Sequence, residues 1–222
     1  TLLENTQSTR YREITSKRIC RKDNDFQNRY ETADSTIRFL FNSVYSENRI
    51  AVVSHDRLDV LASPNGEIVT EAEYLEPVIF LDDTIDGWYH VELPLQRGYT
   101  GYLPFDRIFF LSGAPYEKLV VVDVPTVLAS GAPDSGLPIR NLRGGTILPV
   151  ISTSERYYLV DLEEGPGWIS RDSVLDLTFT SQLPSANEVI SNARRMLGQD
   201  YVWGGATWGS TDCSGFVNIV FR

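Results

Sequence analysis

Short apolar or alternating runs, separated by turns rich in Gly, Pro and Asp, fill residues 49–177 of this chain. Typical runs occupy residues 77–81 and 146–151. Each run is long enough for a β-strand and too short for an ordinary helix, and regular turns between such runs are typical of small all-β units. The hydrophobic pattern therefore predicts a compact β structure over this part of the chain.

Helical spacing of apolar residues occurs on either side of that region. Residues 35–45 form one such run, and we expect a helix that packs on the following domain; a basic arm that contacts a partner is the alternative. Near the end of the sequence, Ser185 and Glu188 have the spacing of a capping box, and apolar positions follow at helical intervals over 189–197. Gly198 is well placed to end this second helix.

An internal repeat divides the β region into two halves. Residues 60–63 recur at 127–130 with the same sequence, VLAS, and residues 101–104 correspond to 167–170. Two copies of one small domain explain this repeat better than a single large fold. Each copy is expected to form a compact all-β barrel.

The repeat and the second helix together predict the domain order. We expect a mainly β chain with an α+β C-terminal part, and these boundaries: an N-terminal segment with a short helix at 1–48, a first barrel at 49–113, a second barrel at 114–178, and the α+β part at 179–222.

The charge of the chain restricts its partners. The formal net charge is −10 at pH 7, and because residues 1–50 carry +2, the remainder carries −12. This balance argues against nucleic acid and suits a substrate that bears ammonium groups. The sequence has neither metal-ligand spacing nor a run that could span a membrane, and we predict no cofactor.

Cys213 begins an apolar run of helical character. At a helix N-terminus its sulfur would lie near unpaired backbone N–H groups and the positive end of the helix dipole, both of which favour a thiolate. A lone cysteine is more often a small buried hydrophobic residue, but the neighbours Asp212, Ser214 and Gly215 do not suit a core strand. We therefore favour a nucleophile, and Cys20 has no spacing that suggests a disulfide.

Two motifs surround this cysteine. Residues 199–205 read QDYVWGG, and residues 212–217 read DCSGFV. Together they resemble the start of the NlpC-type cysteine peptidase domain, and the order of turn, aromatic strand and glycine in each β repeat is similar to that of bacterial SH3-like domains. The resemblance implies two small SH3-like β-barrels followed by the N-terminal third of a papain-like α+β domain.

The same resemblance implies an enzyme that cleaves murein stem peptides of the bacterial cell wall. The Cys213 thiolate would attack the carbonyl between γ-D-glutamate and a diamino acid and form an acyl-enzyme, which water then hydrolyses. The implied substrate has a free N-terminal L-Ala. Tyr201 would bond an oxyanion or a substrate carboxylate, or else pack in the core, and Trp203 and Trp208 are interpreted as packing residues.

Four further residues have both a structural and a chemical interpretation. Asp212 would cap the helix, bind the free amine of the substrate, or do both. Ser214 would offer a backbone N–H or its hydroxyl to the substrate, or only form part of the first helical turn. In the first barrel the resemblance implies an acid at the edge of the cleft, and Glu67 and Glu71 are the two candidates, although most surface glutamates are only solvated.

The family's histidine and the polar group that orients it come from strands after the cysteine helix, beyond residue 222. The only histidines here, His55 and His90, lie far upstream in no such motif. We therefore expect a fragment, or a chain completed by a separate C-terminal piece. The alternative is a non-catalytic wall-binding module with a vestigial cysteine, and rapid alkylation of Cys213 near neutral pH would favour the peptidase.

The compartment follows from the resemblance alone. It implies the bacterial periplasm or the outside of the cell, with recycling of wall fragments in the cytoplasm as the alternative. An initial Thr1 without a signal peptide suggests that a leader was removed. Recruitment of Pro-rich partners by the paired barrels is a third hypothesis, which is disfavoured because the aromatic residues fall mainly at repeat-equivalent strand positions.

Overall fold

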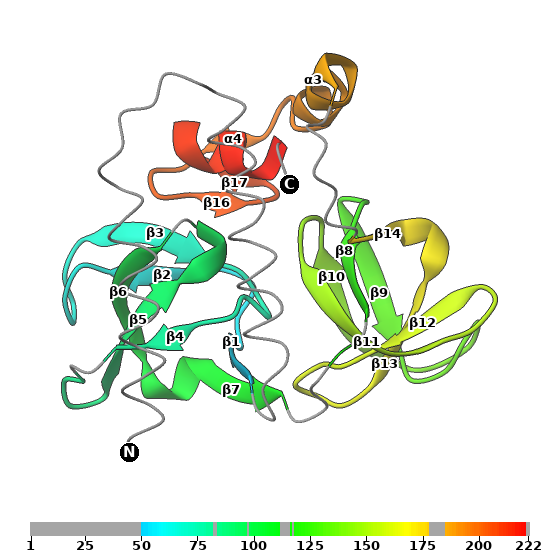
Figure 1. The fold of residues 1–222 in the computed structure, drawn as a ribbon, viewed down its shortest axis with the longest axis horizontal. Helices are drawn as coiled ribbons and strands as arrows, with labels where there is room; N and C mark the ends of the chain where they lie inside the picture. Colours follow the sequence, from blue (N-terminus) through cyan, green and yellow to red (C-terminus); the bar gives the residue numbers. More distant parts are fainter. Residues whose placement is uncertain are drawn as a thin grey trace.

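The computed structural model describes residues 50–81, 84–96, 98–111, 116, 118–177 and 185–220. Two groups of strands lie side by side, and of the C-terminal elements those over residues 206–220 lie above the first group (Figure 1). The predicted mainly β architecture is confirmed, while the helix predicted at 35–45 lies outside the described residues. The SH3-like character of the two groups and the domain boundaries stay predictions.

The first group contains seven strands among the described residues up to position 111. They are β1 (Ile50–Val53), β2 (Leu58–Leu61), β3 (Ile68–Ala72), β4 (Ile79–Phe80), β5 (Trp88–Leu93), β6 (Tyr99–Pro104) and β7 (Ile108–Leu111), with short 3₁₀ turns η1 (Pro94–Gln96) and η2 (Phe105–Arg107). Five strands form a sheet in the order β3-β2-β6-β5-β4, and β1 pairs with β7. Strand β3 is an edge strand, because it stands first in this order. The core of the group includes the buried side chains of Val60, Val91 and Leu103.

The second group forms one seven-stranded sheet within the described part of the chain. Its elements are β8 (Lys118–Val122), β9 (Thr126–Ser130), β10 (Pro138–Arg143), β11 (Ile147–Thr153), β12 (Tyr157–Val160), β13 (Gly167–Ser170), η3 (Arg171–Ser173) and β14 (Val174–Asp176). The strand order is β10-β9-β13-β12-β11-β8-β14. Val120, Leu142, Leu148 and Ile169 are buried in its core.

The sequence repeat corresponds to a repeated strand order. The first group contains the neighbours β2-β6-β5, and the second contains the equivalent neighbours β9-β13-β12. Equivalent glycines allow the close approach of neighbouring strands in both copies: a Cβ on Gly101 would lie 2.7 Å from Val60 Cγ1 of β2, and one on Gly167 would lie 3.2 Å from Ala129 Cβ of β9. The repeat therefore preserves a packing requirement as well as a sequence pattern.

Helix α3 (Ala186–Arg195) begins at the predicted capping box. The Ser185 hydroxyl accepts a hydrogen bond from Glu188 N at 3.3 Å, and Glu188 Oε2 accepts one from Ser185 N at 2.6 Å. Gly198 follows the helix with φ of +85°. Both ends of α3 therefore agree with the sequence prediction.

The remaining elements form a small unit of three short strands and the last described helix. They are β15 (Asp200–Tyr201), β16 (Ala206–Thr207), β17 (Ser210–Thr211) and α4 (Cys213–Val220), and the strands are ordered β15-β17-β16. Met196, Ile219 and Val220 are buried between α3 and α4, with Trp208 and Phe216 packed against them. This cluster joins the two helices.

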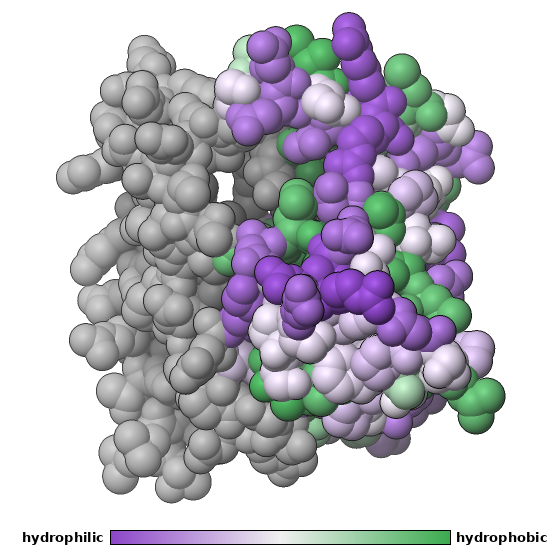
Figure 2. Space-filling view, turned by 90° about the vertical axis from the view of Figure 1, so that its right-hand side faces the viewer, coloured by the Kyte–Doolittle hydropathy of each residue, from purple (hydrophilic) through white to green (hydrophobic). Residues whose placement is uncertain are grey.

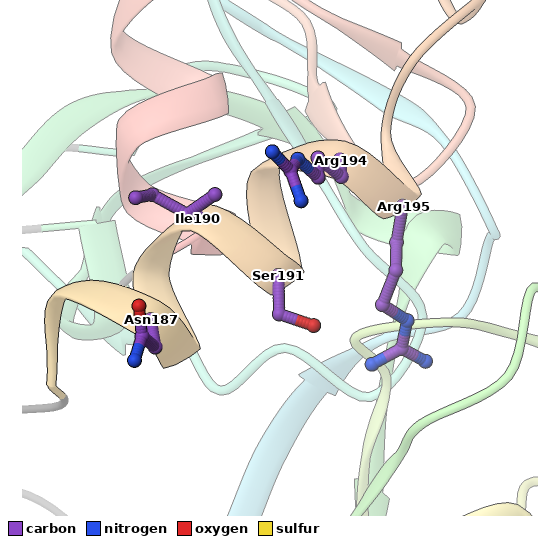
Figure 3. A pocket seen from close by; sticks show the side chains of 5 residues that line it. All are labelled: Asn187, Ile190, Ser191, Arg194 and Arg195. Atoms are coloured by element: carbon purple, nitrogen blue, oxygen red, sulfur yellow. The ribbon is translucent and has the colours of Figure 1, made fainter.

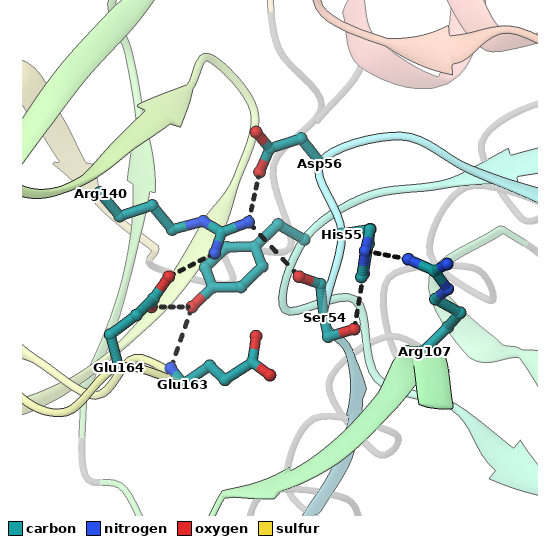
Figure 4. A network of polar contacts seen from close by, with 8 residues as sticks. Ser54, His55, Asp56, Arg107, Arg140, Glu163 and Glu164 are labelled. Carbon is teal, nitrogen blue, oxygen red and sulfur yellow. Dashed lines mark hydrogen bonds and ion pairs between the residues drawn. The ribbon is translucent and has the colours of Figure 1, made fainter. Parts of the chain in front are cut away.

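Arg140 of β10 holds the two strand groups together (Figure 4). Its guanidinium pairs with Asp56 at 2.9 Å and with Glu164 at 2.5 Å, and it lies 3.6 Å above the centre of the Tyr74 ring. Burial raises the pKa of the Tyr74 hydroxyl, so it stays protonated and donates to Glu164 while accepting from Glu163 N. Because the Arg140 side chain is only 17% exposed, this network fixes the relative position of the two groups.

The face formed by the second group and α3 is largely polar. Figure 2 shows apolar residues scattered among hydrophilic ones there, which is ordinary for a surface in water. Among the described residues, no helix combines the length and the apolar character needed to cross a bilayer.

Candidate active site

Cys213 is the first residue of α4. It forms no disulfide and is exposed to solvent. Asp212 stands directly before it and caps the helix. One oxygen, Asp212 Oδ1, accepts hydrogen bonds from Ser214 N at 2.8 Å, from the Ser214 hydroxyl at 2.7 Å and from Gly215 N at 2.7 Å. The capping role predicted for Asp212 is therefore present, and Ser214 belongs to the same first turn.

The Asp212 carboxylate stays ionised in this position. Burial raises its pKa, but the hydrogen bonds from Gly215, Ser214 and the Gly204 backbone lower it by more, so its pKa lies below the ordinary value. The residue beside the thiol is therefore a fixed anion, with Oδ1 committed to the helix N-terminus.

A glycine turn at Gly204 and Gly205 supports the start of α4. A Cβ on Gly215 would lie 2.0 Å from Gly205 O, so the helix packs directly on the backbone of the turn. Asp212 N donates to Gly205 O at 2.9 Å. Gly204 has φ of +76°, a conformation that suits glycine. The QDYVWGG and DCSGFV motifs therefore meet through Gly205, Asp212 and Gly215, on either side of the cysteine in the sequence.

Strand β3 of the first group contacts this glycine turn at Gly204. Glu71 N donates to Gly204 O at 2.9 Å, and a Cβ on Gly204 would lie 3.0 Å from Ile68 Cγ2. The first group therefore contacts the segment that leads to Cys213 through its edge strand.

The two acid candidates differ in their positions. Glu71 is 4% exposed, and its Oε1 accepts from Arg57 at 2.8 Å. Glu71 Oε2 is buried and has no hydrogen-bond partner among the described residues. Glu67 is exposed in the turn before β3. The structure thus brings Glu71, and not Glu67, against the glycine turn.

The second group supports the same segment from another side. Arg195 at the end of α3 donates to Asp123 Oδ1 at 2.6 Å, and its guanidinium lies 5.3 Å from the centre of the Trp208 ring. A Cβ on Gly144 would lie 2.9 Å from Trp208 Cδ2. The segment before Cys213 is therefore held by both strand groups.

The aromatic residues of the first motif behave differently from one another. Tyr201 in β15 is 66% exposed and Trp203 is 75% exposed, whereas Trp208 packs against the α3 and α4 cluster. The packing interpretation is confirmed for Trp208 and wrong for Trp203. Tyr201 belongs to β15, a short strand at the edge of its sheet, and Trp203 lies in the turn that follows, so both aromatic side chains stay in solvent.

No family model matches this sequence. Two curated proteins align with part of it, each named gamma-D-glutamyl-L-lysine dipeptidyl-peptidase. The protein from Bacillus cereus (strain ATCC 10987 / NRS 248) is 27% identical over 136 residues, which are 57% of this chain and 40% of that protein. The protein from Bacillus subtilis (strain 168) is 29% identical over 141 residues, 61% of this chain and 46% of that protein. The chain spans less than half the length of the curated relatives it matches.

A solved structure matches most of the chain. The crystal structure of an NlpC/P60 family protein from Bacillus cereus ATCC 10987 has a TM-score of 0.61 and 19% sequence identity, and the match covers 78% of this chain and 71% of that one. The two chains share a fold. This similarity concerns the backbone arrangement and agrees with the mainly β description given above.

Both histidines take part in contacts of the first strand group. His55 Nδ1 lies 2.7 Å from the Ser54 hydroxyl, and its Nε2 faces the Arg107 guanidinium (Figure 4). The His90 ring stacks on Tyr102 with centres 4.6 Å apart. Among the hydrogen bonds between described residues, none joins either histidine to Cys213, which agrees with the sequence prediction that neither is the catalytic base.

Two hollows lie away from this thiol. One, of about 470 Å³, runs along α3 and is lined by Asn187, Ile190, Ser191, Arg194 and Arg195 (Figure 3). The other, of about 830 Å³, lies beside β7 and β11. Neither contains a sequence-predicted site residue among its described lining residues, so the candidate site rests on the cysteine and its turn.

Sequence reasoning missed two polar residues that hold the acid candidate. Arg57 pairs with Glu71, and Gln96 donates to Glu71 O. Neither belongs to a motif or a periodic pattern, because each acts through contacts between segments far apart in the chain. A buried glutamine has no local sequence signal that separates it from an exposed one.

Proposed function

We propose that this protein is a cysteine peptidase that hydrolyses the bond between γ-D-glutamate and an L-diamino acid in murein stem peptides. The observation that carries the proposal is the free, exposed Cys213 at the N-terminus of α4, a helix whose Gly215 packs directly on the glycine turn. The names of the two relatives and the fold shared with an NlpC/P60 protein support a peptidase of this type.

In the proposed reaction the Cys213 thiolate attacks the γ-carbonyl carbon of D-glutamate. The carbon–sulfur bond forms, the carbon–nitrogen bond breaks, and the amine of the diamino acid leaves with a proton. Water then hydrolyses the thioester and restores the thiol. The backbone N–H of Cys213 would stabilise the oxyanion, because Asp212 already accepts from those of Ser214 and Gly215. The resemblance to NlpC-type peptidases implies a histidine base C-terminal to α4.

The buried carboxylate of Glu71 supports a binding site for the free amine of an N-terminal L-Ala. Oε1 is paired with Arg57, so Oε2 offers an acceptor to an ammonium group. Asp212 Oδ2 is a second acceptor beside the thiol, since Oδ1 caps the helix. Tyr201 and Ser214 are proposed to bond the substrate from the exposed side of the site. Glu67 is the weaker candidate because it lies in solvent.

The experiment is a turnover assay of the natural protein that carries this chain, with L-Ala-γ-D-Glu-diamino acid as substrate. We expect release of the diamino acid, loss of release in Cys213→Ala, and slower release from the N-acetylated substrate. Binding of the peptide without turnover, together with slow alkylation of Cys213 by iodoacetamide, would instead support the wall-binding module. Action in the periplasm or outside the cell is part of the proposal, because murein, the source of such stem peptides, lies there.

A further inference from the structure

Gln96 is an uncharged polar residue buried inside the first strand group. It lies in η1, between β5 and β6, and is 2% exposed. Burial of an amide is unfavourable unless its donors and acceptors are paired. The hydrogen-bond partners of the Gln96 side chain therefore show which part of the chain it holds in position.

Each hydrogen bond of the Gln96 amide reaches the chain between residues 70 and 76. Nε2 donates to Glu71 O at 2.7 Å and to Glu76 Oε2 at 3.0 Å, while Oε1 accepts from the Thr70 hydroxyl at 2.6 Å. Two of the three partners belong to β3. Because all these groups are buried, loss of one partner leaves the others without solvent to replace it.

Edge-strand geometry links Gln96 to the glycine turn. In an antiparallel edge strand, alternate residues direct both N–H and C=O away from the sheet. Glu71 is such a residue in β3: its C=O accepts from Gln96, and its N–H donates to Gly204 O at 2.9 Å. Gly205, the next residue of the turn, accepts from Asp212 N. A continuous set of hydrogen bonds therefore connects Gln96 with the residue before Cys213.

We propose that Gln96 is a positioning residue for the amine end of the substrate. It fixes the main chain of β3, so that Glu71 Oε2 is held at one place relative to the glycine turn and the thiol. Gln96 itself does not touch the substrate and acts through Glu71. This inference rests on the proposed function, because it concerns the amine subsite of that peptidase.

The test measures how strongly the natural protein prefers a free amine. The readout is the ratio of kcat/KM for L-Ala-γ-D-Glu-diamino acid to kcat/KM for its N-acetylated form. Gln96→Met keeps the side-chain size and removes all three hydrogen bonds, and we expect the ratio to fall about tenfold, through KM of the free-amine substrate. Val78→Ala, a packing change in the hydrophobic core of the first strand group, serves as the control for general loss of stability and should leave the ratio unchanged.

A double mutant separates positioning from a purely structural role. If Gln96 acts through Glu71, then Gln96→Met added to Glu71→Gln should change the ratio by less than about twofold. Thr70→Val keeps both donations from Gln96 and removes only the bond to its Oε1, so it serves if Gln96→Met does not fold; we expect a fall of about threefold.

The three unfavourable outcomes of these assays contradict different parts of the proposal. A wild-type preference for the free amine with an unchanged ratio in Gln96→Met, or in Thr70→Val, overturns the role of Gln96 and leaves the peptidase intact. A wild-type ratio near one overturns the amine subsite and, with it, this inference. An absence of turnover on both substrates contradicts the proposed function itself.

Discussion

Replacement of Asp212 by alanine removes the carboxylate that caps the first turn of α4. The three hydrogen bonds to Oδ1, at 2.7 to 2.8 Å, disappear together, and the backbone N–H groups of Ser214 and Gly215 lose their partner. Loss of an N-cap costs about 1 kcal/mol, and hydrogen bonds to a charged group are worth more, so we expect α4 to be destabilised by about 2 kcal/mol.

Amide hydrogen exchange of α4 measures this change directly. A loss of about 2 kcal/mol corresponds to protection factors about 30-fold lower for the amides of the helix. Ser214→Ala is the matched control, because it removes only the hydroxyl donor and leaves both backbone donors paired with Asp212. We expect its effect to be less than half as large. Equal losses in the two variants, or a change below about twofold in Asp212→Ala, would refute the capping account.

The charge of Asp212 gives the same prediction a pH dependence. The pKa of this carboxyl lies below its ordinary value of 3.8, so the folded state gains stability from the ionised form. That contribution is complete above the unfolded pKa and disappears as pH falls through the folded pKa. The stability difference between the wild type and Asp212→Asn should therefore be constant near neutral pH and shrink below pH 3.8. A difference that does not shrink would mean that the charge has no role.

Three further changes test how the parts are held together. Gly215→Ala places a Cβ 2.0 Å from Gly205 O, and we expect a loss of at least about 3 kcal/mol, with α4 displaced and Cys213 alkylated at a changed rate. Arg140→Ala removes both ion pairs and the stack on Tyr74; it should lower the free energy of unfolding by about 1 to 2 kcal/mol, discounted for partial exposure of the carboxylates, and Arg140→Lys should restore only part of this. Ser185→Ala should cost α3 about 1 kcal/mol, visible as faster exchange of its first amides.

The features that the sequence predicted are those with local physical causes. The mainly β architecture follows from short apolar runs between turn residues, and the ends of α3 follow from a capping box and a glycine. The start of α4 at Cys213 likewise agrees with its sequence. In each case the deciding interactions lie within a few residues of one another, so the pattern contains them.

The positions of the acid candidates could not be predicted in the same way. Glu67 and Glu71 are four residues apart in similar surroundings, and only the packing of β3 against the glycine turn separates an exposed carboxylate from a buried one. Trp203 is the reverse case: an aromatic residue in an apparent strand motif is usually packed, but this residue lies in the turn after β15 and is exposed. Such outcomes depend on contacts between distant segments, which neither periodicity nor composition records.

The proposed reaction requires that the Cys213 thiol becomes acylated by the γ-D-glutamyl group. Rapid acid quench of the natural protein during turnover of L-Ala-γ-D-Glu-diamino acid, followed by mass spectrometry of its peptides, tests this claim directly. We predict an adduct of the mass of the L-Ala-γ-D-Glu acyl group on the peptide that contains Cys213. Hydroxylamine should remove this adduct, and it should be absent in Cys213→Ala without any such treatment. Turnover with no adduct on Cys213, or an adduct on another residue, would contradict the proposed reaction.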